Sequence, residues 1–163
     1  MRLFIKRLTI IILVLGLTYL FLEVCQRLSV YYHYHRDVGK FDNELIELVN
    51  PPDKREYILK KDASFTTKKR ITYKTNANRL RGKEYTYDKP DGVSRVLMLG
   101  DSYLFGWALP WEDTVTVKLE DFLNNDPIKE GLRYEVINGG IHGYNTIQEL
   151  EFLRREGLKY GPN

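Results

Sequence analysis

Ser102 is the residue of this chain whose surroundings best suit chemistry, because it follows a short aliphatic run and a glycine in Gly100-Asp101-Ser102. Residues 95–99 are typical of a strand buried on both faces of a parallel sheet. Gly100 allows a sharp backbone turn beneath the hydroxyl. Open α/β sheets keep their active sites at the carboxyl ends of their strands. Ser102 is therefore a candidate nucleophile, although an ordinary turn after a strand would also explain these three residues.

A second unit of the same kind follows along the chain. Residues 134–138 are predicted as a strand that runs into a glycine-rich turn at 139–143 and then into a helix. Two strand-turn-helix units in tandem require a parallel sheet covered by helices, so we expect an α/β fold. Apolar residues at helical spacing after each turn are expected to face this sheet: Val115, Leu119, Phe122, Leu123, Ile147, Leu150 and Leu153.

The two turns resemble those of the SGNH or GDSL-type hydrolases, a family of serine esterases and acylhydrolases with a three-layer, flavodoxin-like fold. Residues 100–102 match the first sequence block of that family, and residues 138–143 look like its second block. Residues 75–82 and 89–92 look like the lead-in of its membrane-anchored members. The resemblance spans residues 71–162 and implies the fold and the reaction class, but no substrate.

The resemblance implies a role for four residues. Ser102 is expected to be the nucleophile and to donate one backbone N–H to the oxyanion, and Gly143 is expected to donate a second. Gly100 and Asp101 are expected to shape the nucleophile turn. A serine hydroxyl needs a neighbouring base, and a tetrahedral intermediate needs preorganised donors. No cofactor or metal is expected, because one cysteine and three scattered histidines offer no ligand spacing.

Two further blocks of the family do not occur in these residues. They are Gly-x-Asn-Asp, which supplies a third oxyanion donor, and Asp-x-x-His, which supplies the base and its orienting acid. Gly143-Tyr-Asn145 reads superficially as Gly-x-Asn, but Asn145 with Gln148 three residues later is better explained as a helix N-cap. The sequence therefore offers a nucleophile without its usual base.

Three ring side chains lie near the candidate site in the sequence. His142 precedes Gly143 and could contact substrate, but a loop histidine that faces solvent is the simpler interpretation. Trp107 and Trp111 follow Ser102, in a loop where aromatic residues often line a substrate cleft. Packing beneath the loop explains the tryptophans equally well.

The resemblance predicts a third aliphatic strand after residues 160–163, where the sequence stops. In the strand order 2-1-3-4-5, the strand before Ser102 would have a partner on one side and an open edge on the other. An open edge invites pairing with another chain. We interpret the sequence as a truncated product, or as one whose remaining strands a neighbouring polypeptide supplies.

An apolar run at residues 8–24 is long enough for a short transmembrane helix of about 26 Å. Three basic residues precede this run: Arg2, Lys6 and Arg7. The positive-inside rule then predicts a cytoplasmic amino terminus and an extracytoplasmic remainder. Glu23 is expected at the far interface, where it reaches water or pairs with Arg27 four residues later.

A cleaved signal peptide and a lipoprotein are the alternatives to this anchor. No small-x-small cleavage site follows the apolar run, and Val24 before Cys25 does not fit a lipid-attachment site. An uncleaved anchor is therefore favoured. Just beyond it, His33 and His35 alternate with tyrosines, as in an interfacial belt.

The segment after the anchor is strongly basic. Residues 53–89 carry twelve Lys or Arg against five Asp or Glu. Such a stretch, interleaved with tyrosines, could bind an anionic polymer, and its place after an anchor favours lipid headgroups or envelope polysaccharide over nucleic acid. The simpler interpretation is a pair of strands at 64–67 and 70–76 whose charged side chains face water. A short helix is predicted at 41–49.

Four segments are therefore predicted: a cytoplasmic basic tail (1–7), a transmembrane anchor (8–24), an extracytoplasmic linker and lead-in (25–92) and the amino-terminal part of an SGNH hydrolase domain (93–163). The expected activity is ester hydrolysis or acyl transfer through an acyl-enzyme at Ser102. By analogy, an O-acetylated envelope glycan is a candidate substrate. The expected partners are the lipid bilayer and such a polysaccharide or acyl ester, with no nucleic acid and no indicated protein partner.

The alternative is a catalytically inactive, truncated homologue or a membrane-tethered binding or assembly component. It follows from the missing Asp-x-x-His, because a triad without its base loses most of its rate.

Overall fold

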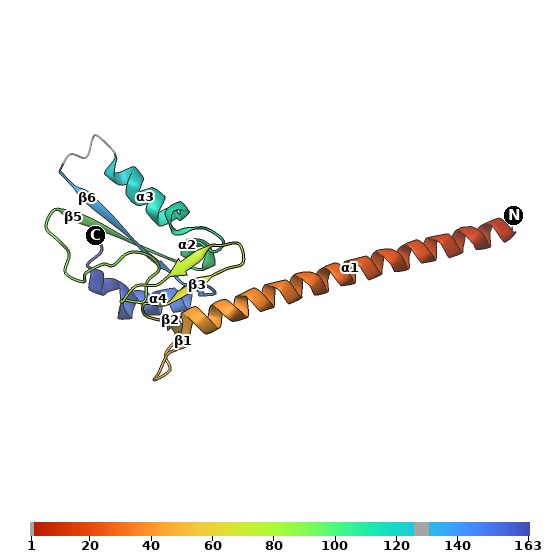
Figure 1. Cartoon of the computed structure of the whole chain (residues 1–163), viewed down its shortest axis with the longest axis horizontal. Helices are drawn as coiled ribbons and strands as arrows, with labels where there is room; N and C mark the ends of the chain where they lie inside the picture. Colours follow the sequence, from red (N-terminus) through yellow and green to blue (C-terminus); the bar gives the residue numbers. More distant parts are fainter. Residues whose placement is uncertain (1, 126–130) are drawn as a thin grey trace. The chain divides into compact units, whose positions relative to one another are not determined.

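The computed structural model describes residues 2–125 and 131–163, without the side chains of residues 3, 5, 8 and 33–39. His33 and His35, predicted to lie in an interfacial belt, are therefore outside the described side chains. The chain divides into two compact units, Met1–Lys40 and Phe41–Asn163. Figure 1 gives the order of the helices and strands along the chain.

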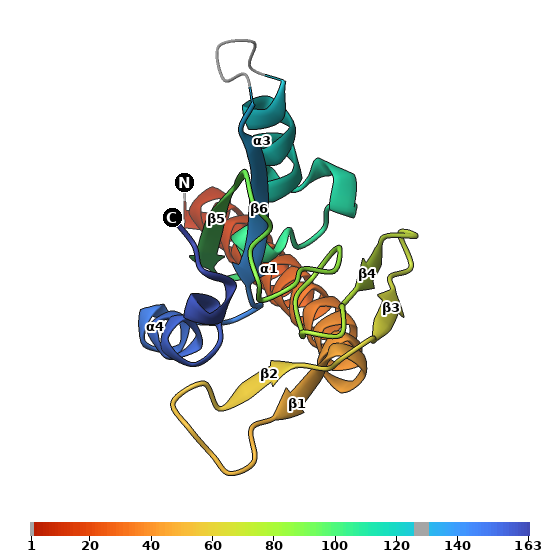
Figure 2. The same ribbon diagram turned by 90° about the vertical axis from the view of Figure 1, so that its left-hand side faces the viewer.

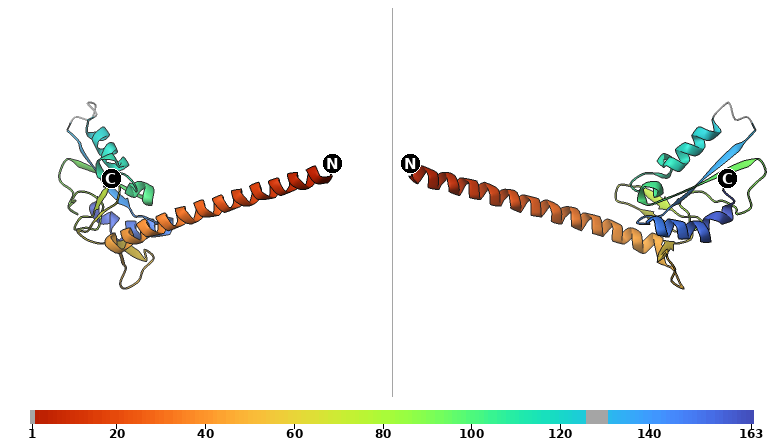
Figure 3. Two further views of the ribbon diagram at one scale, coloured as in Figure 1. Left: turned by 45° about the vertical axis from the view of Figure 1, so that its right-hand side comes forward. Right: turned by 180° about the vertical axis from the view of Figure 1, so that it is seen from behind.

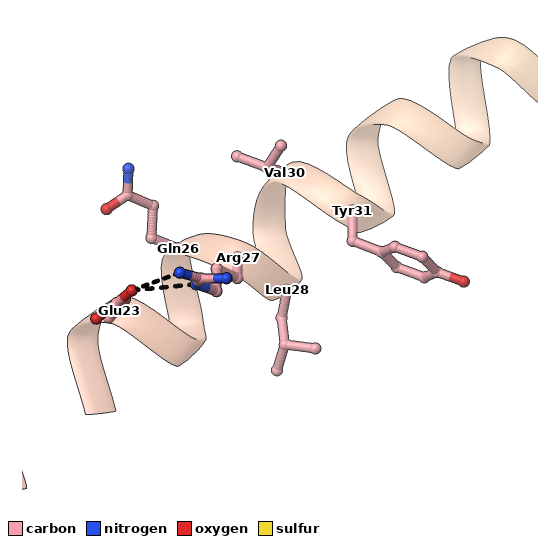
Figure 4. A pocket seen from close by; sticks show the side chains of 6 residues that line it. All are labelled: Glu23, Gln26, Arg27, Leu28, Val30 and Tyr31. Atoms are coloured by element: carbon pink, nitrogen blue, oxygen red, sulfur yellow. Dashed lines mark hydrogen bonds and ion pairs between the residues drawn. The ribbon is translucent and has the colours of Figure 1, made fainter. Parts of the chain in front are cut away.

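Helix α1 (Arg2–Leu45) contains one segment, Thr9–Tyr32, that is long and apolar enough to cross a membrane. This segment includes most of the apolar run predicted at 8–24 and continues beyond it. The Nη2 atom of Arg27 lies 2.8 Å from Oε1 of Glu23, one turn away on the same helix (Figure 4). The predicted ion pair at i, i+4 is thus confirmed.

Two small antiparallel hairpins follow α1: β1 (Ile46–Leu48) pairs with β2 (Tyr57–Leu59), and β3 (Ser64–Thr66) with β4 (Thr72–Lys74). The strands predicted at 64–67 and 70–76 are confirmed in shorter form. The helix predicted at 41–49 is wrong beyond Leu45, because residues 46–48 pair with β2 instead.

An aromatic cluster holds these hairpins to the rest of the second unit. The buried ring of Phe41 meets the rings of Tyr73, Phe105 and Trp107 edge-on, with centroids 4.9 to 5.6 Å apart. Edge-to-face contacts of this kind are favourable because the positive ring edge meets a negative ring face. Residues on both sides of position 92 therefore share one core.

The parallel pair predicted from the sequence is present. Strand β5 (Val93–Gly100) pairs in parallel with β6 (Arg133–Gly140), from Val93↔Arg133 to Gly100↔Gly140. The helices are α2 (Ser102–Phe105), α3 (Val115–Asn124) and α4 (Thr146–Arg155), with short 3-10 turns η1 (Trp111–Asp113) and η2 (Gly157–Tyr160). The β5–β6 pair lies between α3 and α4 (Figures 1 and 2). The second unit is thus a mixed helix-and-sheet structure with a small parallel sheet.

The burial expected for this sheet and its helices is partly wrong. In β5 only Arg95 is buried and the aliphatic residues are half-buried, because β5 has one strand partner within the described residues. Phe122 is 70% exposed and Ile147 63% exposed, whereas Leu119 and Leu153 are partly covered. Two strands are too narrow to cover the whole apolar face of either helix.

Arg95 ties the carboxyl-terminal residues to the strand pair. Its Nε donates to Oε2 of Glu135 at 2.8 Å, and its Nη1 donates to the carbonyls of Thr86 at 2.7 Å and Tyr160 at 3.0 Å. Asn163 also bonds the backbone of Arg95, with its N–H donating to the carbonyl at 3.0 Å. The marked carboxyl terminus accordingly lies close to the strand pair in both views of Figure 3. Three segments far apart in the sequence thus meet at one buried guanidinium.

We expect Arg95→Met to lower the free energy of unfolding by about 3 kcal/mol or more, because it leaves the Glu135 carboxylate unpaired and nearly buried. Denaturant unfolding of the full chain in detergent, followed by tryptophan fluorescence, measures this change. The matched control is Arg133→Met at an exposed position, with an expected change within about 0.5 kcal/mol. The double variant Arg95→Met with Glu135→Gln should recover part of the lost stability. Equal losses in Arg95→Met and in Arg133→Met would contradict the stabilising role of the Arg95–Glu135 pair.

Candidate active site

The carboxyl ends of β5 and β6 bring the two predicted turns to one edge of the sheet. Gly100 and Gly140 are the last paired residues, and the N–H of Ile141 donates to the carbonyl of Gly100 at 3.0 Å. The chain then continues to Ser102 on one side and to Gly143 on the other. Two candidate residues about 40 positions apart in the sequence therefore leave the sheet at the same edge.

Helix α2 packs directly on these strand ends, and a glycine makes this possible. A Cβ at Gly140 would lie 2.4 Å from the backbone nitrogen of Phe105 and 2.8 Å from the carbonyl carbon of Leu104. Both contacts are with backbone atoms, which cannot move aside cheaply. The absence of a side chain at Gly140 thus sets the close approach of α2 to β6.

Two polar side chains hold the turn before α2. Asp101 is the N-cap, and its Oδ1 accepts a hydrogen bond from the N–H of Tyr103 at 2.9 Å. Asn138, fully buried in β6, donates to the carbonyl of Leu104 at 2.9 Å and accepts from the N–H of Gly140 at 2.9 Å. Sequence reasoning gave Asn138 no role of its own, although an amide at the end of an apolar strand is a signal of such a link.

Three donor groups of Ser102 and Gly143 have no hydrogen-bond partner in the part of the chain that the structure describes, although the Ser102 carbonyl accepts from the N–H of Trp107 at 2.9 Å. Within the described part of the chain, neither the hydroxyl nor the N–H of Ser102 makes a hydrogen bond, and neither does the N–H of Gly143. The neighbouring N–H groups of Tyr103 and Ile141 are bonded inside the protein. Ser102 is only partly buried and Gly143 is exposed, so these donors are accessible. A hydroxyl and N–H donors are the kinds of group that acyl transfer uses, and here they follow the two strand ends at one edge of the sheet.

The interpretation of His142 as a solvent-facing loop histidine is wrong. Its ring is half-buried, with its centroid 4.7 Å from that of Trp107 and 5.4 Å from that of Phe41. Burial lowers the pKa of His142, and the charges of Asp42 and Asp101 only partly oppose this effect. The imidazole is therefore neutral near pH 7 and packs within the aromatic cluster.

Tyrosines fix the backbone of this second turn. The hydroxyl of Tyr57 donates to the carbonyl of His142 at 3.0 Å, and the hydroxyl of Tyr144 donates to the carbonyl of Tyr57 at 2.6 Å. Gly143 has a φ of +82°, and a Cβ there would lie 2.7 Å from the Tyr57 oxygen. Both conformation and space therefore favour glycine at this position.

Arg81 holds the loop that follows α2. Its Nη1 donates to the carbonyls of Phe105 at 2.6 Å and Gly106 at 2.7 Å, and its Nη2 donates to the carbonyl of Leu109 at 2.7 Å. The side chain is fully buried, and burial lowers its pKa to about 10. The charged side chains Arg70 and Lys74 of the strands predicted at 64–67 and 70–76 are exposed, as expected. Arg81 lies beyond these strands and is buried instead, with loop carbonyls in place of water around its guanidinium.

Trp107 and Asn145, also singled out near the site in the sequence, have packing and capping roles. Trp107 stacks on Tyr73, with ring centroids 5.6 Å apart, so it packs beneath the loop. The predicted N-cap of α4 is confirmed: Oδ1 of Asn145 accepts from the N–H of Gln148 at 3.2 Å, and Oε1 of Gln148 accepts from the N–H of Asn145 at 3.0 Å. Asn145 is thus engaged in capping.

A scan against protein-family models finds no match for this chain, and a search of the curated proteins also finds none. The resemblance to SGNH hydrolases therefore stands on the residues at 100–102 and 138–143 and on the lead-in residues.

The burial of His142 predicts a specific pH dependence of stability. Because the folded-state pKa lies below the ordinary value of 6.5, the unfolded chain binds a proton first as the pH falls. The contribution of His142 to the free energy of unfolding is therefore fully present above pH 6.5, and it is lost as the pH falls toward the folded-state pKa. We expect His142→Gln to remove this slope, measured by denaturant unfolding at a series of pH values.

An NMR titration of the His142 ring gives the independent check, with a midpoint expected below 6.5. A midpoint at or above 6.5 would contradict the lowered pKa of His142. Asp53 does not interfere with this test, because its lowered pKa makes its contribution to stability disappear only as the pH falls below 3.8.

Proposed function

We propose that this chain carries the nucleophile and two oxyanion donors of a membrane-anchored serine ester hydrolase or acyltransferase of the SGNH type. The observation that carries the proposal is that the accessible hydroxyl and N–H of Ser102 and the N–H of Gly143, unpaired within the described residues, follow two paired strands at the same end of a parallel sheet. Asp101 and Asn138 hold the turn that presents them. The two turns are also the segments that resemble the family.

In the proposed reaction, Oγ of Ser102 attacks the carbonyl carbon of an ester. The carbonyl oxygen becomes an oxyanion that accepts hydrogen bonds from the N–H groups of Ser102 and Gly143. Collapse of the intermediate breaks the ester C–O bond, and the alcohol leaves with a proton. The acyl-enzyme then transfers its acyl group to water or to another hydroxyl.

A base must take the Ser102 proton during this attack. Within the described residues no side chain makes a hydrogen bond to the Ser102 hydroxyl. His142 is neutral, and its ring packs against those of Phe41 and Trp107 in the aromatic cluster. The proposal therefore needs a base other than the groups that contact Ser102 within the described residues.

The apolar segment Thr9–Tyr32 supports an anchored enzyme that acts on an envelope component, with its amino terminus in the cytoplasm and the unit Phe41–Asn163 outside. An O-acetylated glycan carries esters in that compartment. This substrate is an analogy with the function of membrane-anchored members of the family.

We expect a fluorophosphonate probe to label this protein in native membranes, where any further part or partner is present. Ser102→Ala should abolish labelling of the band, because the probe reacts only with an activated serine. Ser64→Ala, at an exposed position on β3, is the control and should label like the wild type. Absence of labelling in folded wild-type protein would remove the nucleophile assignment and favour an inactive, membrane-tethered binding or assembly component.

The proposed orientation predicts the accessibility of Lys68, an exposed residue between β3 and β4. We expect Lys68→Cys, made in a Cys25→Ser background, to react with a membrane-impermeant maleimide on intact cells. Arg2→Cys in the same background should react only after the cells are permeabilised. The reverse pattern would show that the second unit is cytoplasmic.

A further inference from the structure

A second candidate site lies on the hairpin side of the loop that Arg81 holds. It is a hollow of about 310 Å³, at the small end for ligand sites, and six residues line it: Thr72, Lys74, Arg81, Gly82, Lys83 and Trp111. Three of these residues are cationic and none is acidic. The hollow thus combines an aromatic wall with positive charge.

The aromatic wall is preformed. Gly82 has a φ of +114°, and a Cβ there would lie only 2.3 Å from the Trp111 ring, so the indole packs directly on the backbone. The hydroxyl of Thr114 donates to the Trp111 carbonyl at 2.7 Å and fixes the turn that carries the tryptophan. A ligand would therefore lose little of its binding free energy in ordering this wall.

The positive charge of the hollow is only partly neutralised. Lys83 pairs with Glu120, whereas exposed Lys74 makes no ion pair within the described residues. Arg81 binds carbonyl oxygens but no carboxylate, and its buried Nε has no hydrogen-bond partner in the described part of the chain. From residue 63 to residue 83 the chain has seven Lys or Arg and no Asp or Glu. An anion in the hollow would stabilise this cluster.

We propose that this hollow binds one anionic sugar unit of a glycan, with the apolar face of the sugar against Trp111 and its acidic group at Lys74 and Lys83. The proposal does not depend on catalysis at Ser102. A nucleic acid strand fits less well, because single strands bind along grooves with successive stacked aromatic residues. This hollow offers one indole and space for about one ring.

Arg81 connects the hollow with the candidate active site. The same guanidinium that lines the hollow bonds the carbonyls of Phe105 and Gly106, at the end of the short helix that begins with Ser102. A glycan held in the hollow would thus contact the arginine that bonds the end of this helix. This placement fits a chain that selects acidic glycans carrying esters.

The test uses the full chain in detergent and trigalacturonic acid, which carries one carboxylate on each ring, with its methyl ester as the uncharged match. We expect trigalacturonic acid to change the tryptophan fluorescence and to bind at least about tenfold more tightly than the ester. Lys74→Gln should weaken this binding about tenfold, the size of one charge-assisted hydrogen bond. Because Lys74 is exposed and forms no ion pair, this variant should fold normally.

Lys54→Gln is the matched control, since Lys54 is exposed and lies outside the hollow, and it should bind like the wild type. Trp111→Phe, with its fold checked by circular dichroism, should weaken binding as well, measured calorimetrically. Ser102→Ala should leave the affinity unchanged, so the two proposals can fail separately. Absence of binding, equal binding of the methyl ester or of a single-stranded oligonucleotide, or equal losses in the Lys74 and Lys54 variants would overturn the proposal.

Discussion

The parallel register of β5 and β6, which ends with Gly100 opposite Gly140, is the constraint on which the candidate active site depends. It makes the two chain segments leave the sheet at the same edge, and the hydrogen bond from Ile141 to Gly100 continues the pairing into the turns. Glycine at 140 then lets α2 approach the strand ends, where Asn138 bonds both the turn and the helix. Loss of this register would separate Ser102 from Gly143 without changing either residue.

Two buried arginines connect the basic lead-in segment to the rest of the second unit: Arg95 at the strand pair and Arg81 at α2 and the loop after it. Arg95 has a carboxylate partner in Glu135. The Nη atoms of Arg81 instead bond three backbone carbonyls, its Nε has no hydrogen-bond partner within the described residues, and the charge of Glu112 only partly opposes the effect of burial on its pKa. Burial of an unpaired cation is costly, and a structure keeps it only where other interactions compensate. At Arg81 the compensation includes contact with the rings of Tyr73 and Phe105, at 4.6 and 5.0 Å from their centroids.

The two sites proposed in the second unit differ in the chemistry that their residues offer. The edge at Ser102 and Gly143 offers a hydroxyl and backbone donors, which as proposed suit an ester but give little selectivity. The hollow at Trp111 offers charge and an aromatic face, which suit recognition but no bond cleavage. His142 belongs to neither role, because its neutral ring fills the aromatic cluster around Phe41. Arg81 is the residue that both regions share.

The sequence by itself determined the local features. Alternation and apolar runs predicted β3, β4, β5 and β6, the spacing of Glu23 and Arg27 predicted their ion pair, and Asn145 with Gln148 predicted the cap of α4, because such patterns depend on neighbours within a few residues. Tertiary structure alone decided which charges are buried. Arg81 and Lys74 belong to one basic segment, yet only Arg81 meets carbonyls from residues 105–109, and His142 is covered by rings distant in the sequence. Burial depends on such long-range contacts, and no local pattern encodes them.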